Sequence, residues 1–210
     1  MQKFFLIIIV VAFVGCKNEK NIPDVSKIKT PVTIERFEQD FFKTDTNNIS
    51  VALDSLQKKY PKFLNDYLYN ILGSAPQQDS VVRYVKLFLN EYQSVYKTSQ
   101  KQFSSFNKYQ KQIEQSFQFI HYYFPQYLLP KNIITFIGPL DGTANALTSS
   151  GMAIGLQSYL GKDFEGYHSE YISQVYPAYK SRNFEPEYLA VNCVKNIIED
   201  MHRIKLLADL

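Results

Sequence analysis

The sequence predicts an α+β fold in which a helical N-terminal layer packs with a small antiparallel sheet and a C-terminal helix. Two observations support this prediction. From residue 46 to residue 124 apolar residues recur at helical spacing, and from residue 132 they gather in short runs broken by glycine, as in strands. Of the 210 residues, 45% are hydrophobic and 20% are charged, so the chain can bury the core of one domain. We place that single domain at residues 31–210.

The domain begins with a short strand and two helices. Residues 32–34 are β-branched and predict the strand. A helix follows, with an apolar face that runs from Ile49 to Tyr60. Pro61 is suited to the first turn of the next helix, and Gly73 to its end.

Two longer helices complete the N-terminal layer. The first has its apolar face between Val81 and Tyr96, and the second between Phe103 and Phe124, where Pro125 closes it. Aromatic stripes at this spacing are more often part of a core than a platform for a ligand. We therefore assign both faces to the core.

The sheet and the last helix follow. Residues 133–137 are a candidate buried strand, Asp141-Gly142 forms a turn, and residues 144–156 contain two more short strands. Glu185-Pro186-Glu187 then opens a helix that runs through Met201.

The first residues predict export and a lipid anchor. Lys3 precedes an uninterrupted apolar run from Phe4 to Val14, which is shorter than the about 20 residues of a membrane-spanning helix. A charged start, a short apolar stretch and a small residue at Gly15 are typical of a signal peptide, here residues 1–15. The ending at Cys16 resembles the lipobox of bacterial lipoproteins, so we predict lipidation of Cys16, with residues 16–30 as its tether. Several acyl chains on one cysteine suffice for stable attachment to a membrane.

Charge and cysteine content exclude two other classes. The 23 basic and 20 acidic residues give a net charge of +3 without a basic block, so nucleic acid is not an expected partner. Two cysteines cannot build a disulfide scaffold. Cys193 lies in an apolar helical stretch and is predicted to be a buried core residue.

Motifs for catalysis are scarce. The three histidines, His121, His168 and His202, are too far apart for the zinc-peptidase helix motif, which needs two histidines one turn apart. We interpret His121 as a core or boundary residue. A histidine–carboxylate site assembled from distant segments, using His168 or His202, stays open as an alternative. We expect no cofactor and no metal.

A stretch rich in tyrosine follows the predicted sheet and offers a candidate binding surface. A tyrosine has an apolar face and a hydroxyl, so such a stretch could stack on a sugar or a peptide. Packing of an irregular loop over the sheet is the favoured alternative. The candidate surface residues are Tyr159, Asp163, Tyr167, His168, Tyr179, Arg182 and Tyr188.

An ordered set of short segments resembles the gliding motility lipoprotein GldB family of the Bacteroidetes. The segments are Cys16, Ile34-Glu35-Arg36-Phe37, Asp40-Phe41-Phe42, Lys58-Lys59-Tyr60-Pro61, Tyr122-Tyr123-Phe124-Pro125, Tyr159-Leu160-Gly161-Lys162-Asp163 and Pro186-Glu187-Tyr188. The resemblance implies a lipoprotein that faces the periplasm, is needed for gliding and is associated with type IX secretion and motility machinery. It implies no established catalytic activity. It also implies that the chain is short for the family, either as a variant or through C-terminal truncation.

Three functions follow from these observations. The first is a non-enzymatic envelope lipoprotein that acts through contacts with other envelope proteins. The second is a metal-dependent peptidase-like hydrolase, because the layout is loosely similar to predicted zinc peptidases; here Asn192-Cys193-Val194-Lys195-Asn196 offers no ligand pair on the corresponding helix. The third is a glycan-binding module. Lys17, where an acidic retention residue could stand, favours the outer membrane over the inner.

Overall fold

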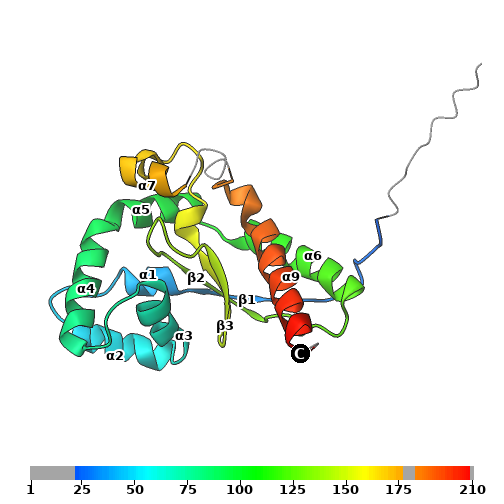
Figure 1. Ribbon diagram of the computed structural model, residues 1–210, viewed down its shortest axis with the longest axis horizontal. Coiled ribbons are helices and arrows are strands. Elements are labelled where there is room, and N and C mark those ends of the chain that lie inside the picture. Colours follow the sequence, from blue (N-terminus) through cyan, green and yellow to red (C-terminus); the bar gives the residue numbers. More distant parts are fainter. Residues whose placement is uncertain (1–21, 177–182, 209–210) are drawn as a thin grey trace, which may run out of the picture.

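The molecule is a four-stranded sheet with helices at both ends. The computed structural model describes residues 22–176 and 183–208, so the predicted signal peptide and Cys16 lie outside the described residues. Helices α4 and α5 lie at one end of the sheet, and α6 and α9 at the other (Figure 1). The predicted α+β class is confirmed.

The N-terminal layer lies between the first and second strands. After β1 (Thr33–Arg36), the chain forms seven consecutive helical segments. These are α1 (Phe37–Phe41), α2 (Ile49–Lys59), α3 (Phe63–Asn65), the π-helix η1 (Asp66–Ile71), α4 (Gln78–Glu91), α5 (Gln93–Gln102) and α6 (Asn107–Tyr123).

The predicted helical faces are mostly in the core, but two boundaries differ from the prediction. Ile49 and Leu56 of α2 are buried, as their spacing predicts. The predicted third helix is divided at Tyr92, where α4 ends and α5 begins. Phe103 and Phe106 are buried but precede α6, because the chain turns between α5 and α6.

The sheet is mixed, so the predicted antiparallel sheet is wrong for two of its three pairings. Strand β2 (Asn132–Phe136) pairs in parallel with β1 and with β4 (Gly151–Gly155), while β3 (Asn145–Thr148) is antiparallel to β4, in the order β1-β2-β4-β3. The physical reason is the connection. A long helical crossover from β1 to β2 returns the chain in the same direction, whereas the short link from β3 to β4 makes a hairpin.

An aromatic cluster joins the helical layer to the sheet. The ring of Phe37 lies between those of Phe41, Phe63 and Tyr67, with centroids 5.5, 5.0 and 4.7 Å away. Tyr67 also donates a hydrogen bond from its hydroxyl to the Ile137 carbonyl, 2.7 Å away. Such edge-on and offset ring pairs stabilise a core beyond the area they bury.

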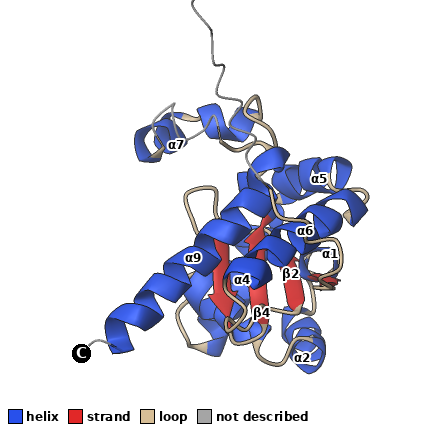
Figure 2. Ribbon diagram, turned by 90° about the vertical axis from the view of Figure 1, so that its right-hand side faces the viewer, coloured by secondary structure: helices blue, strands red, loops and turns tan. Residues whose placement is uncertain are grey.

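The C-terminal part consists of short turns and one long helix. The short elements are η2 (Leu156–Ser158), η3 (Glu165–His168), α7 (Glu170–Val175) and η4 (Pro186–Tyr188). Helix α9 (Leu189–Ala208) packs against α6 and edge strand β3. Figure 2 shows α9 beside the strands of the sheet. In α9, Cys193 is buried, as predicted. Among the described residues, no helix combines the length and apolar character that crossing a membrane requires.

Candidate functional site

Two residues of the predicted binding surface are in the core. Tyr159 is 0% exposed and Tyr167 is 3% exposed, so neither ring can stack on a sugar or a peptide. The prediction of a surface position is wrong for both. The segment has no clear periodicity that would have shown which tyrosines face inward.

The other residues of that surface are dispersed. Asp163, His168 and Tyr188 are exposed, and His168 Nε2 lies 3.1 Å from the Lys162 carbonyl oxygen. Tyr179 and Arg182 lie outside the described residues. Among the described residues, the predicted binding surface is therefore reduced to separate exposed side chains.

Tyr159 belongs to a buried polar cluster beneath α9. Its hydroxyl accepts a hydrogen bond from Asn192 Nδ2 and donates one to Asn145 Oδ1, both at 3.0 Å. Asn145 Nδ2 in turn donates to Cys193 Sγ, 3.7 Å away. Burial raises the pKa of the Tyr159 phenol and of the Cys193 thiol, so both groups stay protonated at neutral pH. The cluster holds α9 on the sheet and has no ionised nucleophile.

In the peptidase-like layout considered from the sequence, the metal motif would lie on this part of α9. Asn192 and Asn196 are one turn apart on the helix, and Asn192 is already bonded to Tyr159. Within residues 22–176 and 183–208, no group of three or more histidine, cysteine, aspartate or glutamate side chains is placed to hold a metal ion. His168 and His202, the alternative candidates, are both exposed.

The carboxyl end of the parallel strands is filled by the protein itself. Open sheets of this kind bind ligands in the crevice outside that end. Here the buried Gln157 side chain accepts from Gly138 N at 2.9 Å and donates to the Thr143 carbonyl at 3.0 Å. At Gly155, a Cβ atom would come within 2.6 Å of Gln157 Nε2 and 2.7 Å of the Ala144 carbonyl. Glycine at this position therefore lets Gln157 close the crevice.

A cleft of about 930 Å³ lies between α5 and the segment Phe164–Ser169, and the end of α4 also contributes to its lining. It is lined by the carboxylates Glu91 and Glu165, by His168, and by apolar side chains such as Val95. The cleft is thus acidic and partly apolar. We call it the acidic cleft.

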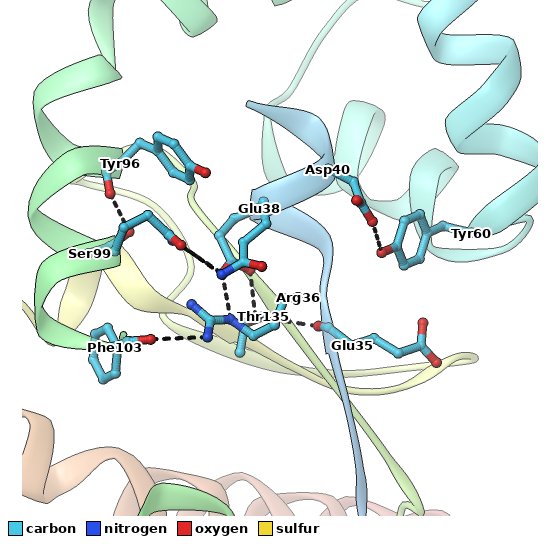
Figure 3. Close-up of polar contacts among 11 residues, drawn as sticks. Glu35, Arg36, Glu38, Asp40, Tyr60, Tyr96, Ser99, Phe103 and Thr135 are labelled. Atoms are coloured by element: carbon cyan, nitrogen blue, oxygen red, sulfur yellow. Dashed lines mark hydrogen bonds and ion pairs between the residues drawn. The ribbon is translucent and has the colours of Figure 1, made fainter. Parts of the chain in front are cut away.

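A second buried polar cluster, which the sequence did not predict, joins β1, α1 and β2 (Figure 3). Glu38 is 0% exposed, and its carboxylate accepts from Arg36 Nε at 2.7 Å and from Thr135 Oγ1 at 2.5 Å. Arg36 Nη1 donates to the Phe103 carbonyl at 3.0 Å, at the end of α5. The Arg36 guanidinium lies over the ring of Phe106, 5.5 Å from its centroid. The pair connects four segments and is a structural feature.

Exposed apolar side chains gather where α6 ends and in the loop that follows it. We call this surface the aromatic end; it consists of the aromatic residues Tyr122, Tyr123 and Phe124 and of Leu128. Tyr122, Tyr123 and Phe124 are about half exposed, and Leu128 is 92% exposed. Phe124, predicted to lie on the core face of its helix, is thus at the surface, because it follows the last turn of α6.

His121 is also exposed, so the prediction of a core or boundary histidine is wrong. It lies on the outer face of the last turn of α6, where Ile120 takes the buried position. A groove of about 900 Å³ separates the segment Tyr123–Leu128 from the middle of α9, which contributes Ile198 and Met201.

The chain was compared with known protein families, curated proteins and solved structures. A family model described as gliding motility protein GldB matches residues 18–209, which is nearly the whole chain. No curated protein and no solved structure gives a significant match.

Proposed function

Because the chain belongs to the family of the gliding motility protein GldB, we propose that it serves gliding as a non-enzymatic lipoprotein of the cell envelope. In this proposal Cys16 carries the lipid, the domain faces the periplasm, and the outer membrane is the favoured location. The protein acts through contacts with other envelope proteins of the type IX secretion and motility machinery.

The observation that supports a non-enzymatic role is the cluster beneath α9. Asn192 and Cys193 lie on the helix that would carry the metal motif in a peptidase-like layout. Asn192 donates to the Tyr159 hydroxyl, and Asn145 hydrogen-bonds with both Tyr159 and Cys193. A thiol and a phenol that burial keeps protonated can contribute to stability but do not attack a substrate.

The acidic cleft is the surface that best fits a protein partner. Figure 1 shows α5 and α7 at one end of the molecule, and the described start of the chain leaving from the other end. A cleft at that place faces away from the anchor. Its carboxylates Glu91 and Glu165 suit a partner segment that combines lysine or arginine with apolar side chains.

A deletion strain tests the role in gliding. We expect the deletion to abolish colony spreading and secretion through the type IX machinery, and the wild-type lipoprotein to restore both. A deletion strain that spread and secreted normally would refute the proposal. Stoichiometric zinc in the purified lipoprotein would instead favour the hydrolase.

Charge reversal tests the acidic cleft. We expect Glu91→Lys combined with Glu165→Lys to prevent restoration, because the cleft would repel a basic partner. Asp54→Lys, an exposed carboxylate on α2, is the matched control and should restore spreading. Equal restoration by both variants would show that the cleft is not the partner surface.

A further inference from the structure

We propose that the aromatic end docks on the surface of the same bilayer that holds the lipid anchor. The occupant of this surface is thus a lipid headgroup region. The inference rests on the proposed lipidation of Cys16, and it adds a second contact with the membrane that fixes the orientation of the domain.

The aromatic end has the composition of a membrane-interface surface. The rings of Tyr122 and Tyr123 meet nearly at right angles with centroids 5.0 Å apart, and Phe124 and Leu128 line the adjoining groove. Clustered exposed apolar side chains of this kind mark interaction surfaces. Tyrosine is enriched where one part of a side chain meets lipid and the other meets water.

The path of the chain brings the anchor to this end. Residues 28–32 run along α6 in the opposite direction: Gln110 Nε2 donates to the Val32 carbonyl at 2.9 Å, and Gln118 Nε2 donates to the Ile28 carbonyl at 2.8 Å. Followed toward the N-terminus, the chain therefore approaches the last turn of α6. Figure 1 shows it leaving the fold beside that end.

The distance to the lipid is short. The chain from Cys16 to Ile22 can extend over at most about 20 Å, given about 3.3–3.6 Å per residue. A lipid on Cys16 thus keeps the start of the described domain within that distance of the headgroups. The end of the domain that lies nearest the anchor is the aromatic end.

Charge supports the same orientation. The segment that leads to the anchor has two exposed lysines, Lys27 and Lys29, against one exposed carboxylate, Asp24. Basic residues next to a membrane attachment are attracted to anionic lipids. The opposite end of the molecule contains the acidic cleft, which an anionic surface would repel.

Depth-dependent fluorescence quenching tests the proposal on the full lipoprotein. Leu128→Cys is labelled with an environment-sensitive fluorophore, and the protein is reconstituted into vesicles of phosphatidylethanolamine and phosphatidylglycerol that contain brominated acyl chains. Cys193 does not compete for the label because it is buried. Val51→Cys, at a 66% exposed position on α2, is the matched control.

We expect the bromolipids to quench the label at position 128 and to leave the label at position 51 unchanged, as for an interfacial depth of about 5–10 Å. Leu128→Asp places a charge on the aromatic end and should release this surface from the bilayer. A label on Tyr123→Cys should then no longer be quenched by the bromolipids. Quenching that is equal at positions 128 and 51 would overturn the proposal.

Other outcomes identify other occupants and also overturn the proposal. A label at position 128 that is shielded in detergent, in a protein of twice the expected mass, would show that a second copy covers the aromatic end. Shielding in a monomer would assign the surface to the chain's own C-terminal residues. Protein that does not float with the vesicles would show that the lipid attachment on which the proposal rests is absent. The assay contains no other envelope protein, so its result does not depend on the proposed protein contacts in gliding.

Discussion

The buried pair of Arg36 and Glu38 gives a sharp prediction about stability. Glu38→Gln keeps the shape of the side chain but removes the charge that faces the guanidinium. Arg36 then remains as a cation with a side chain only 17% exposed, and its Nη2 has no hydrogen-bond partner among the described residues. Removing one partner of a buried ion pair costs about 3–5 kcal/mol, because the other charge stays desolvated.

The exposure of the two side chains sets the order of the effects. Since Arg36 keeps some contact with water, we expect Glu38→Gln to cost about 3 kcal/mol, the lower end of the range. Arg36→Met leaves a carboxylate that is 0% exposed, so it should cost about 4–5 kcal/mol. In a domain of this size 1 kcal/mol lowers the melting temperature by roughly 2–4 °C, so Glu38→Gln should lower it by about 6–12 °C.

The double variant separates charge from packing. Arg36→Met combined with Glu38→Leu removes both charges, and we expect it to cost less than Arg36→Met alone. The assay is urea unfolding of the purified lipoprotein, followed by circular dichroism. A double variant that costs as much as Arg36→Met alone or more, or a Glu38→Gln variant as stable as wild type, would refute the reasoning.

Three further predictions concern single residues. Tyr159→Phe should cost about 1–3 kcal/mol in urea unfolding, because the buried amide of Asn145 and the partly buried amide of Asn192 lose their partner; a wild-type midpoint would contradict this. Cys193 should react with a thiol reagent only after unfolding, since it is buried and burial raises its pKa, and labelling of the native protein would count against its position. Burial raises the pKa of Asp40, but hydrogen bonds from Lys59 and Tyr60 outweigh this and lower it. The carboxylate therefore stabilises the fold above about pH 4, and that contribution is lost as the pH falls through the lowered pKa. Asp40→Asn should be less stable than wild type at pH 7, with a difference that shrinks at low pH; a difference independent of pH would exclude this role.

Much of the helical layer could be predicted because its residues repeat with a helical period. Ile49 and Leu56 on α2 are buried where their spacing placed them. The break at Tyr92 could not be predicted, since the apolar residues keep their spacing through it and the change is in the backbone alone. The parallel pairing of β1 with β2 could not be predicted either, because the residues of a strand do not indicate which other strand it pairs with.

The site was harder to predict than the fold. In the tyrosine-rich stretch the partners that draw Tyr159 inward, Asn145 and Asn192, come from β3 and α9, which lie far apart in the sequence. In the sequence, the only sign of the ion pair between Arg36 and Glu38 is their two-residue spacing at the end of a strand. Such a spacing is common on exposed surfaces, and burial appears only when α5 and β2 cover it.

The pairing of β1 with β2 has a consequence for how the protein is made. A chain that is exported from its N-terminus delivers β1 first, yet its parallel neighbour emerges only after α1 to α6 have passed, and β4 later still. Strand pairings between residues this far apart in sequence form slowly, because the entropy cost of closing a long loop comes before any stabilising contact is made. Until these strands pair, the aromatic side chains of the helical layer have no sheet to pack against and stay exposed. If the chain is exported as we propose, we expect it to need a holding factor until the residues of β4 have crossed the membrane.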